Sequence, residues 1–174
     1  PPKPSWLASG EKVVTGWFWL YGSGCMVQAV QFWLGPLTDS VSFTTPSTPV
    51  YENVALVGAT GAVGRIVLEQ LAQREFPFRS LKLLASSRSA GTEIEFGGKA
   101  LKVELLEPKA FQGVDLVIAS TPDEVSKEFA PWAVDAGAVV VDESGYWRMD
   151  PSVPLVVPEV NPDAVDQHRG IVAS

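Results

Sequence analysis

Cysteine and histidine are nearly absent from this chain of 174 residues, which has one of each, Cys25 and His168. An internal disulfide framework needs paired cysteines and a Cys/His metal centre needs several ligands, so the composition excludes both. Positive charge is also scarce, because 13 Lys and Arg face 20 Asp and Glu and leave a net charge of −7. A nucleic-acid partner would require a basic surface, so we expect none.

Charged residues are missing altogether between Val13 and Thr38. A mostly apolar run of this kind is long enough to cross a bilayer as a helix, which needs about 20 residues. Aromatic residues lie near both of its ends, as in the belts at the two membrane interfaces; they are Trp17, Phe18, Trp19, Phe32 and Trp33. We therefore predict an N-terminal tail over residues 1–12, a single transmembrane helix over residues 13–36, and a location in a membrane.

Two polar side chains within this run, Gln28 and Gln31, argue against a membrane span. The alternatives are an aromatic arm that binds a partner protein and the remnant of a targeting sequence. The side of the membrane stays open as well. Lys3 and Lys12 would place the N-terminus in the cytoplasm and the following domain across the membrane, but two lysines are thin evidence.

Residues 37–51 are rich in Ser, Thr and Pro, a composition that cannot bury a core and is typical of an extended linker. Residues 52–174 contain an ordinary mixture of charged and apolar residues and are predicted to form one domain. The chain therefore divides into a tail, an apolar segment, a linker and a folded domain.

The stretch from Val54 to Gly64 reads Val-Ala-Leu-Val-Gly-Ala-Thr-Gly-Ala-Val-Gly. Its apolar beginning predicts a short buried strand, and the spacing over residues 62–74 predicts a helix. Glycines between them permit a tight turn and a close approach of the backbone to a phosphate. The N-terminus of the helix offers free N–H groups to an anion. The pattern predicts a dinucleotide-binding turn, with a plain tight turn as the alternative.

Strands and helices alternate along the rest of the domain. The expected segments are the strands 81–85, 114–120 and 138–142, a β-hairpin over 92–104, and a helix from Asp123, its N-cap, to about residue 136. The first helix is expected to bury Ile66, Leu68, Leu71 and Ala72. This order implies an α/β fold with a Rossmann-like, doubly wound, mostly parallel sheet. Ligands of such folds lie beyond the carboxyl ends of the strands, where the loops 58–64, 86–89, 120–122 and 142–144 should converge.

The loop after the second predicted strand indicates which cofactor binds. Proteins of this fold that prefer NAD carry Asp or Glu here to bind the ribose 2′-hydroxyl. This chain has Ser86-Ser87-Arg88-Ser89. A guanidinium with neighbouring hydroxyls can bind a 2′-phosphate through charge-assisted hydrogen bonds, so we predict NADP. A solvated surface loop is the alternative.

Five motifs follow one another in the domain: Gly58 to Gly64, Leu83 to Gly91, Ser126 to Pro131, Arg148 to Asp150, and Val153 to Pro162. In these residues and this order, residues 53–174 resemble the N-terminal, NADP-binding half of the aspartate-semialdehyde dehydrogenases. The resemblance implies a reduction of an acyl phosphate to an aldehyde by NADPH, through a thioester on a catalytic cysteine.

The resemblance also implies roles for single residues. Arg148 would bind the substrate phosphate, and a guanidinium suits that task because it grips phosphate with two hydrogen bonds. The remaining predicted site residues would bind the diphosphate and the 2′-phosphate of the cofactor; they are Gly58, Thr60, Gly61, Ala62, Val63, Gly64, Ser86, Arg88 and Ser89.

The sequence departs from the family pattern where catalysis is concerned. In the family the catalytic cysteine follows closely after a stretch such as residues 170–173, whereas this sequence stops at Ser174, ahead of the catalytic half. Cys25 lies in the apolar run and His168 in a polar segment expected to face solvent, so we assign no catalytic residue and no metal ligand. Glu143 stands where the family usually has asparagine.

Three functions follow from these observations. The first is a non-catalytic, membrane-anchored domain that serves as a docking subunit of a membrane complex, respiratory or photosynthetic, and contacts other membrane-protein subunits through its apolar helix. The second is a fragment of an active NADP-dependent aspartate-semialdehyde dehydrogenase. The third is a regulatory sensor that binds NADP(H) without chemistry.

Overall fold

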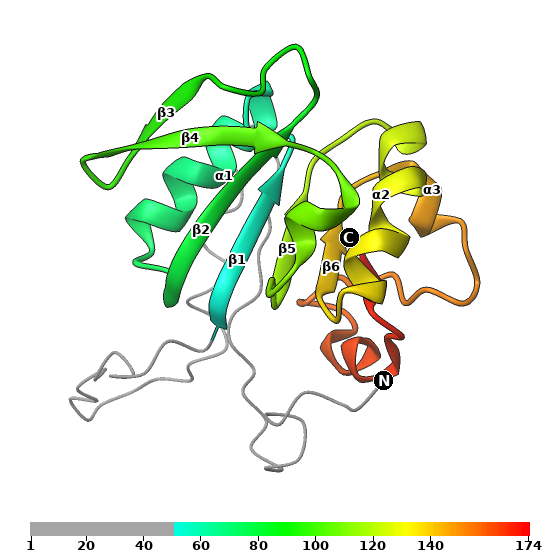
Figure 1. Ribbon diagram of the computed structural model, residues 1–174. Helices are drawn as coiled ribbons and strands as arrows, with labels where there is room; N and C mark the ends of the chain where they lie inside the picture. The colour runs from blue at the N-terminus through cyan, green and yellow to red at the C-terminus, as the bar shows by residue number, and fades with distance from the viewer. Residues whose placement is uncertain (1–50) are drawn as a thin grey trace, which may run out of the picture. The chain divides into compact units, whose positions relative to one another are not determined.

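The computed structural model describes residues 51–174, and a seven-stranded sheet with the order β3-β4-β2-β1-β5-β6-β7 forms the centre of that region (Figure 1). Every neighbouring pair of strands is parallel except β3 and β4. The strands are β1 (Tyr51–Val57), β2 (Phe78–Ala85), β3 (Glu93–Phe96), β4 (Lys99–Leu105), β5 (Leu116–Ala119), β6 (Val139–Asp142) and β7 (Ile171–Ala173). The predicted Rossmann-like, mostly parallel α/β fold is confirmed.

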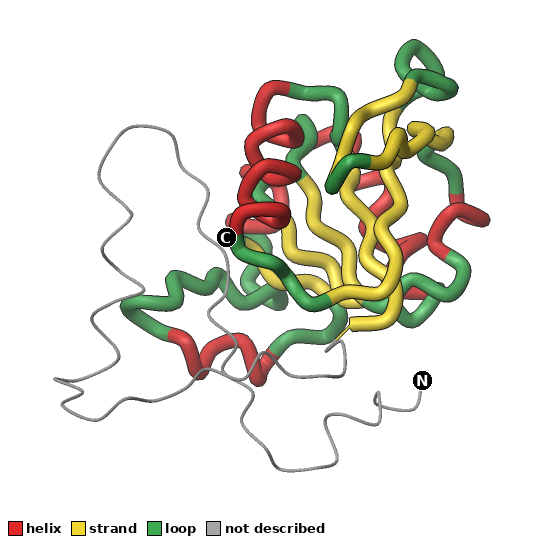
Figure 2. The backbone as a smooth tube through the Cα atoms, turned by 90° about the vertical axis from the view of Figure 1, so that its left-hand side faces the viewer, coloured by secondary structure: helices red, strands yellow, loops and turns green. Residues whose placement is uncertain are grey.

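Helices cover both faces of this sheet, as the edge-on view in Figure 2 shows. They are α1 (Ala62–Gln73), α2 (Asp123–Asp135) and the short α3 (Gly145–Arg148), with 3₁₀ turns at Pro108–Phe111 and Pro162–Gln167. The chain moves outward from β1 to β2 in one direction and from β5 to β6 in the other. Because crossovers between parallel strands are right-handed, α1 and α2 lie on opposite faces.

The alternation of side chains along β1 supplies both halves of the core. Ala55 and Val57 belong to a buried cluster with Phe111 and Phe129 on the face covered by α2. Val54 and Leu56 point to the opposite face because successive strand residues alternate, and all four β1 side chains are fully buried. A strand buried on both faces reads as a continuous apolar run, which is why the sequence made it easy to recognise.

The buried face of α1 differs from the expected one. Val67, Leu68, Leu71 and Gly64 are buried, which is the spacing of one helical stripe. Ile66 is 43% exposed and Ala72 is also exposed, so their assignment to the inner face is wrong. Ile66 is apolar, but it precedes the stripe by one position and therefore points away from the sheet.

The hairpin predicted over residues 92–104 is confirmed as the antiparallel pair β3 and β4, which turns at Gly97 and Gly98 with φ of +57° and +75°. Asp123 is not the N-cap of α2. That position belongs to Pro122, and Asp123 is the first helical residue, with its carboxylate accepting a hydrogen bond from Gly145 N at 2.8 Å. Two short elements were not predicted from the sequence: α3 has four residues and β7 has three.

The predicted tail, transmembrane helix and most of the linker fall on residues 1–50, outside the described residues. Tyr51, placed at the end of the linker, is instead the buried first residue of β1. From Tyr51 to Ser174, no helix has the length and apolar character needed to cross a membrane.

The stacked pair Phe111 and Phe129, with ring centroids 5.9 Å apart, joins α2 to the preceding 3₁₀ turn. We expect Phe129→Ala to lower the free energy of unfolding by about 3–5 kcal/mol, because Phe129 is 1% exposed and its removal leaves a cavity. Urea denaturation followed by circular dichroism measures the change. Its exposed neighbour provides the control, since Glu128→Ala should change the free energy by no more than about 0.5 kcal/mol. Equal effects of the two substitutions would contradict this account of the core.

Candidate cofactor site

The turn between β1 and α1 is built from glycines that have no room for a side chain. Gly58 has φ of +86°, and a Cβ there would lie 2.2 Å from the carbonyl oxygen of Ser120. A Cβ on Gly64 would lie 2.2 Å from the carbonyl oxygen of Gly58. Both separations are far below van der Waals contact, so the end of β1, the start of α1 and the end of β5 approach one another as only glycine permits.

The N-terminus of α1 opens directly beyond this turn. Gly61 is its N-cap and provides no side-chain hydrogen bond, and the first turn contains no acidic residue. The N–H of Arg65 is bonded back to Gly61 O at 3.1 Å, whereas the N–H groups of the first turn have no carbonyl ahead of them in the helix. Ala62 and Val63 are exposed there. These donors and the positive end of the helix dipole form a suitable site for a diphosphate.

The Ser86–Ser89 loop lies beside the glycine turn, and a hydrogen bond joins the two. Thr60 Oγ1 donates to Ser89 Oγ at 3.2 Å, and the loop closes through Ser89 N to Ser86 O at 2.9 Å. Arg88 is exposed and makes no ion pair with any residue in 51–174. A guanidinium in this state can bind a phosphate without breaking an existing ion pair.

The ends of β5 and β6 complete the row of loops. Ser120 N donates to Val57 O on β1 at 3.1 Å, and Glu143 N donates to Ala119 O on β5 at 3.2 Å. Burial raises the pKa of Glu143 above its usual value, the nearby Ser120 side chain lowers it, and the charges of Asp142 and Arg148 raise and lower it in turn.

A buried carboxylate fixes the backbone around Glu143. Asp142 accepts hydrogen bonds from Ser126 Oγ at 2.5 Å, from Ser144 N at 2.7 Å and from the Ser144 hydroxyl. Ser126 Oγ in turn accepts from Trp147 Nε1 at 2.9 Å. A buried carboxylate needs such donors to offset its loss of solvation, and here they tie the β6 end to α2 and α3.

Arg148 is the predicted ligand of the substrate phosphate. Its Nε donates to Ser174 O and its Nη2 to Glu143 O, both at 2.7 Å. A guanidinium has five N–H donors, so these two bonds leave others for an anion. Its role toward substrate stays a prediction.

The four predicted loops thus meet at the carboxyl ends of the strands. Direct contacts run from Ser89 to Thr60, from Gly58 to Ser120, and from Glu143 to Ala119, the residue before Ser120. The strand order changes direction between β1 and β5, and that is the point at which open α/β sheets bind dinucleotides. Glu143 and Ser120 were not among the predicted site residues, because only the pairing of β5 with β6 shows that their side chains meet.

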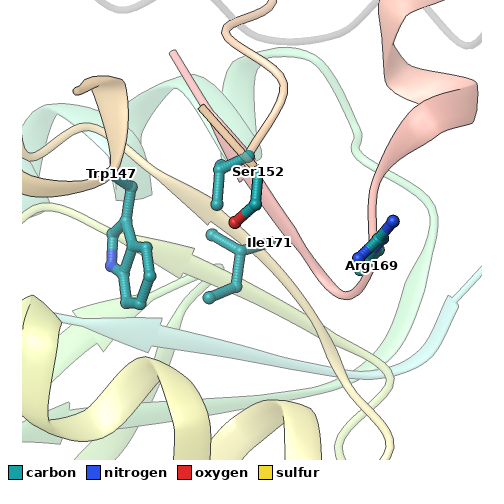
Figure 3. A pocket seen from close by; sticks show the side chains of 5 residues that line it. Trp147, Ser152, Arg169 and Ile171 are labelled. Atoms are coloured by element: carbon teal, nitrogen blue, oxygen red, sulfur yellow. The ribbon is translucent and has the colours of Figure 1, made fainter. Parts of the chain in front are cut away.

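A cavity of about 140 Å³ lies elsewhere, beside β7. Figure 3 shows the Trp147 indole at one end of it, Arg169 at the other, and Ser152 and Ile171 between them. None of its lining residues comes from the loops that follow β1, β2 and β5. It is therefore separate from the row of loops assigned to the cofactor.

Comparison with known proteins decides the family. Residues 53–168 match the model of the semialdehyde dehydrogenase NAD-binding domain. The chain belongs to the semialdehyde dehydrogenase family. This confirms the resemblance inferred from the five motifs. The glycine turn lies within the matched NAD-binding domain.

Relatives of this semialdehyde dehydrogenase domain are aspartate-semialdehyde dehydrogenases. One from Synechocystis is 54% identical over 121 residues, which are 70% of this chain and 36% of that protein. The crystal structure of a Vibrio cholerae aspartate-semialdehyde dehydrogenase II complexed with ASA superposes with a TM-score of 0.67 at 46% identity, over 70% of this chain and 40% of that one. A Candida albicans enzyme solved with NADP gives 0.59 at 25% identity, over 71% and 42%. The chain thus spans little more than a third of the length of such relatives.

Two glycines with nearly the same backbone test how tightly the cofactor turn is built. Gly58 and Gly91 have φ of +86° and +90°, but a Cβ at Gly91 would meet nothing within 4 Å. Gly91→Ala should cost only the backbone strain, about 1 kcal/mol. Gly58→Ala adds a collision with Ser120 and should cost about 1–3 kcal/mol more. Thermal and urea unfolding measure both, and equal losses would show that the contact with Ser120 does not constrain the turn.

Proposed function

We propose that residues 53–174 are the NADP-binding part of an aspartate-semialdehyde dehydrogenase. The observation that carries the proposal is the Thr60–Ser89 hydrogen bond, which joins the glycine turn to a loop whose arginine has no ion pair within residues 51–174. A diphosphate at the start of α1 and a 2′-phosphate at Ser86, Arg88 and Ser89 would then belong to a single cofactor. The similarity to aspartate-semialdehyde dehydrogenases supports this assignment.

The reaction of that family supplies the wider context of the proposal. An acyl group is transferred from phosphate to a cysteine thiolate, and hydride from NADPH then reduces the thioester to an aldehyde. Residues 51–174 contain no cysteine. We therefore assign these residues the binding of NADP and, through Arg148, of the substrate phosphate, and we assign none of them the nucleophilic step.

The hypothesis of a docking subunit in a membrane complex has less support than the dehydrogenase hypothesis. It depended on an apolar helix in residues 13–36, which lie outside the described residues, and the relatives named above are dehydrogenases. Contacts of residues 13–36 with membrane-protein subunits stay a proposal. Carbonate extraction of membranes would test the membrane anchor on which these contacts depend, because an integral membrane protein resists such extraction.

The preference for NADP over NAD depends on Arg88. We expect Arg88→Ala to weaken NADP binding about 10- to 100-fold, because charge-assisted hydrogen bonds contribute about 1.5–3 kcal/mol, and to leave NAD binding unchanged. Isothermal titration calorimetry measures both affinities. The control is Arg79→Ala, because Arg79 is also exposed but pairs with Glu52 at the opposite end of β2. Equal losses for NADP and NAD would contradict binding of the 2′-phosphate by Arg88.

A chimera tests the dehydrogenase assignment itself. Residues 53–174 would replace the matching segment of the Synechocystis enzyme, which supplies the rest of the protein. We expect phosphate-dependent reduction of NADP by aspartate semialdehyde, and a KM for NADP about 10- to 100-fold higher when Arg88→Ala is introduced. A chimera that folds and binds NADP without turnover would favour the sensor hypothesis, and one that folds without binding NADP would favour the docking hypothesis.

A further inference from the structure

We propose that Glu143 makes this site discriminate between the two redox forms of its nicotinamide cofactor, so that the oxidised form binds more tightly when the Glu143 carboxyl group is ionised. The inference rests on the proposed NADP site. Glu143 is not among the predicted cofactor ligands. The phosphate-binding loops cannot distinguish the two redox forms, because both forms carry the same phosphates.

The order of the strand ends places Glu143 on the side of the site opposite the 2′-phosphate loop. The Ser86–Ser89 loop follows β2, the glycine turn follows β1, and Ser120 and Glu143 follow β5 and β6. Neighbouring strands lie about 4.8 Å apart, so Glu143 is roughly 10 Å from the glycine turn. A dinucleotide with its adenosine end at β2 and its diphosphate at β1 extends its nicotinamide end toward β5 and β6.

Contacts within the protein bring the carboxyl group to this row of strand ends. The carbonyl oxygen of Ser120 abuts Gly58, and the Ser120 side chain lies near enough to the Glu143 carboxyl group to lower its pKa. Glu143 N is also held by Ala119 O at 3.2 Å. The side chain is only partly exposed, so its charge is screened less by water and salt than a surface charge would be.

The two redox forms differ in the charge of the nicotinamide ring. The ring is a cation in NADP⁺ and neutral in NADPH. An ionised carboxylate attracts the cation and gives no comparable attraction to the neutral ring, and at short range in a partly buried site this difference is appreciable. A neutral carboxyl group does not discriminate in this way.

The groups around Glu143 determine the pKa of its carboxyl group. Burial has the largest effect and raises the pKa of Glu143, the Ser120 side chain after β5 lowers it, and Asp142 at the end of β6 and Arg148 on α3 act with opposite signs. Arg148 donates two hydrogen bonds, to the carbonyl oxygens of Glu143 and Ser174. From α2, Asp123 accepts a hydrogen bond from Gly145 N. The balance leaves the pKa raised, so a cation that arrives nearby must lower it.

The sign of the pH effect follows from this linkage. Below its pKa Glu143 is neutral, so it should not favour the binding of either redox form. As pH rises through that pKa the carboxylate forms and NADP⁺ affinity increases relative to NADPH. Ionisation of the 2′-phosphate near pH 6 affects both forms equally and cancels in the ratio of their dissociation constants.

The experiment is a titration of the full chain with NADP⁺ and with NADPH between about pH 4.5 and 8. For the wild-type protein we expect the ratio Kd(NADPH)/Kd(NADP⁺) to rise about tenfold over this range, equivalent to one unit of pKa shift. Glu143→Gln should keep the ratio flat and leave the NADPH affinity within about twofold. Glu128→Gln, the same change at an exposed position on α2, should behave as wild type.

A second measurement needs no variant. Calorimetry of the wild-type protein in buffers of different ionisation enthalpy should detect more proton release on binding NADP⁺ than on binding NADPH. Equal proton release for the two cofactor forms would overturn the role of Glu143 while leaving the cofactor site intact. So would a Glu143→Gln protein whose ratio Kd(NADPH)/Kd(NADP⁺) rises with pH as in the wild type. Failure of both cofactor forms to bind the wild-type chain would overturn the proposed function and this inference together.

Discussion

The close approach of the β1 end to the β5 end is the constraint on which the rest of the site depends. Gly58 lies against the carbonyl oxygen of Ser120, and Gly64 lies against the carbonyl oxygen of Gly58. No other residue fits at either position, because any Cβ would fall well inside van der Waals distance. The approach brings the N-terminus of α1 over the carboxyl end of the sheet and leaves its N–H groups directed at the point where the strand order changes direction.

Two further arrangements turn this backbone feature into a site with chemical preferences. On the β2 side, the Thr60–Ser89 hydrogen bond places a serine- and arginine-containing loop next to the glycine turn. On the β6 side, the buried carboxylate of Asp142 holds the following residues against α2 and α3 through Ser126 and Ser144. The glycines provide the tight turn, and the proposed selectivity for the cofactor depends on the residues on either side of it.

Much of this architecture was readable from the sequence because it depends on short-range patterns. The apolar run of β1, the glycine turn, the spacing of α1 and the Gly97-Gly98 hairpin are each local signals. The errors came where the local pattern was ambiguous: Ile66 is apolar but points outward, and β7 has only three residues and exists because β6 pairs with it. Likewise, the meeting of Ser120 with Glu143 depends on strands whose registration the sequence does not state. Because residues 1–50 lie outside the described residues, the structure does not test the predicted transmembrane helix.

The glycine turn by itself is weak evidence of function, because the same glycines would be needed for a tight strand-to-helix turn without any ligand. What a merely structural turn would not require is the combination around it: a helix start with no acidic residue, and an exposed arginine without an ion pair among residues 51–174. A positive charge beside an open helix N-terminus favours the binding of an anion. The chain has a net charge of −7, yet no carboxylate in residues 51–174 lies within ion-pair distance of Arg88. That arrangement favours retention of phosphate binding over a turn kept for its shape alone.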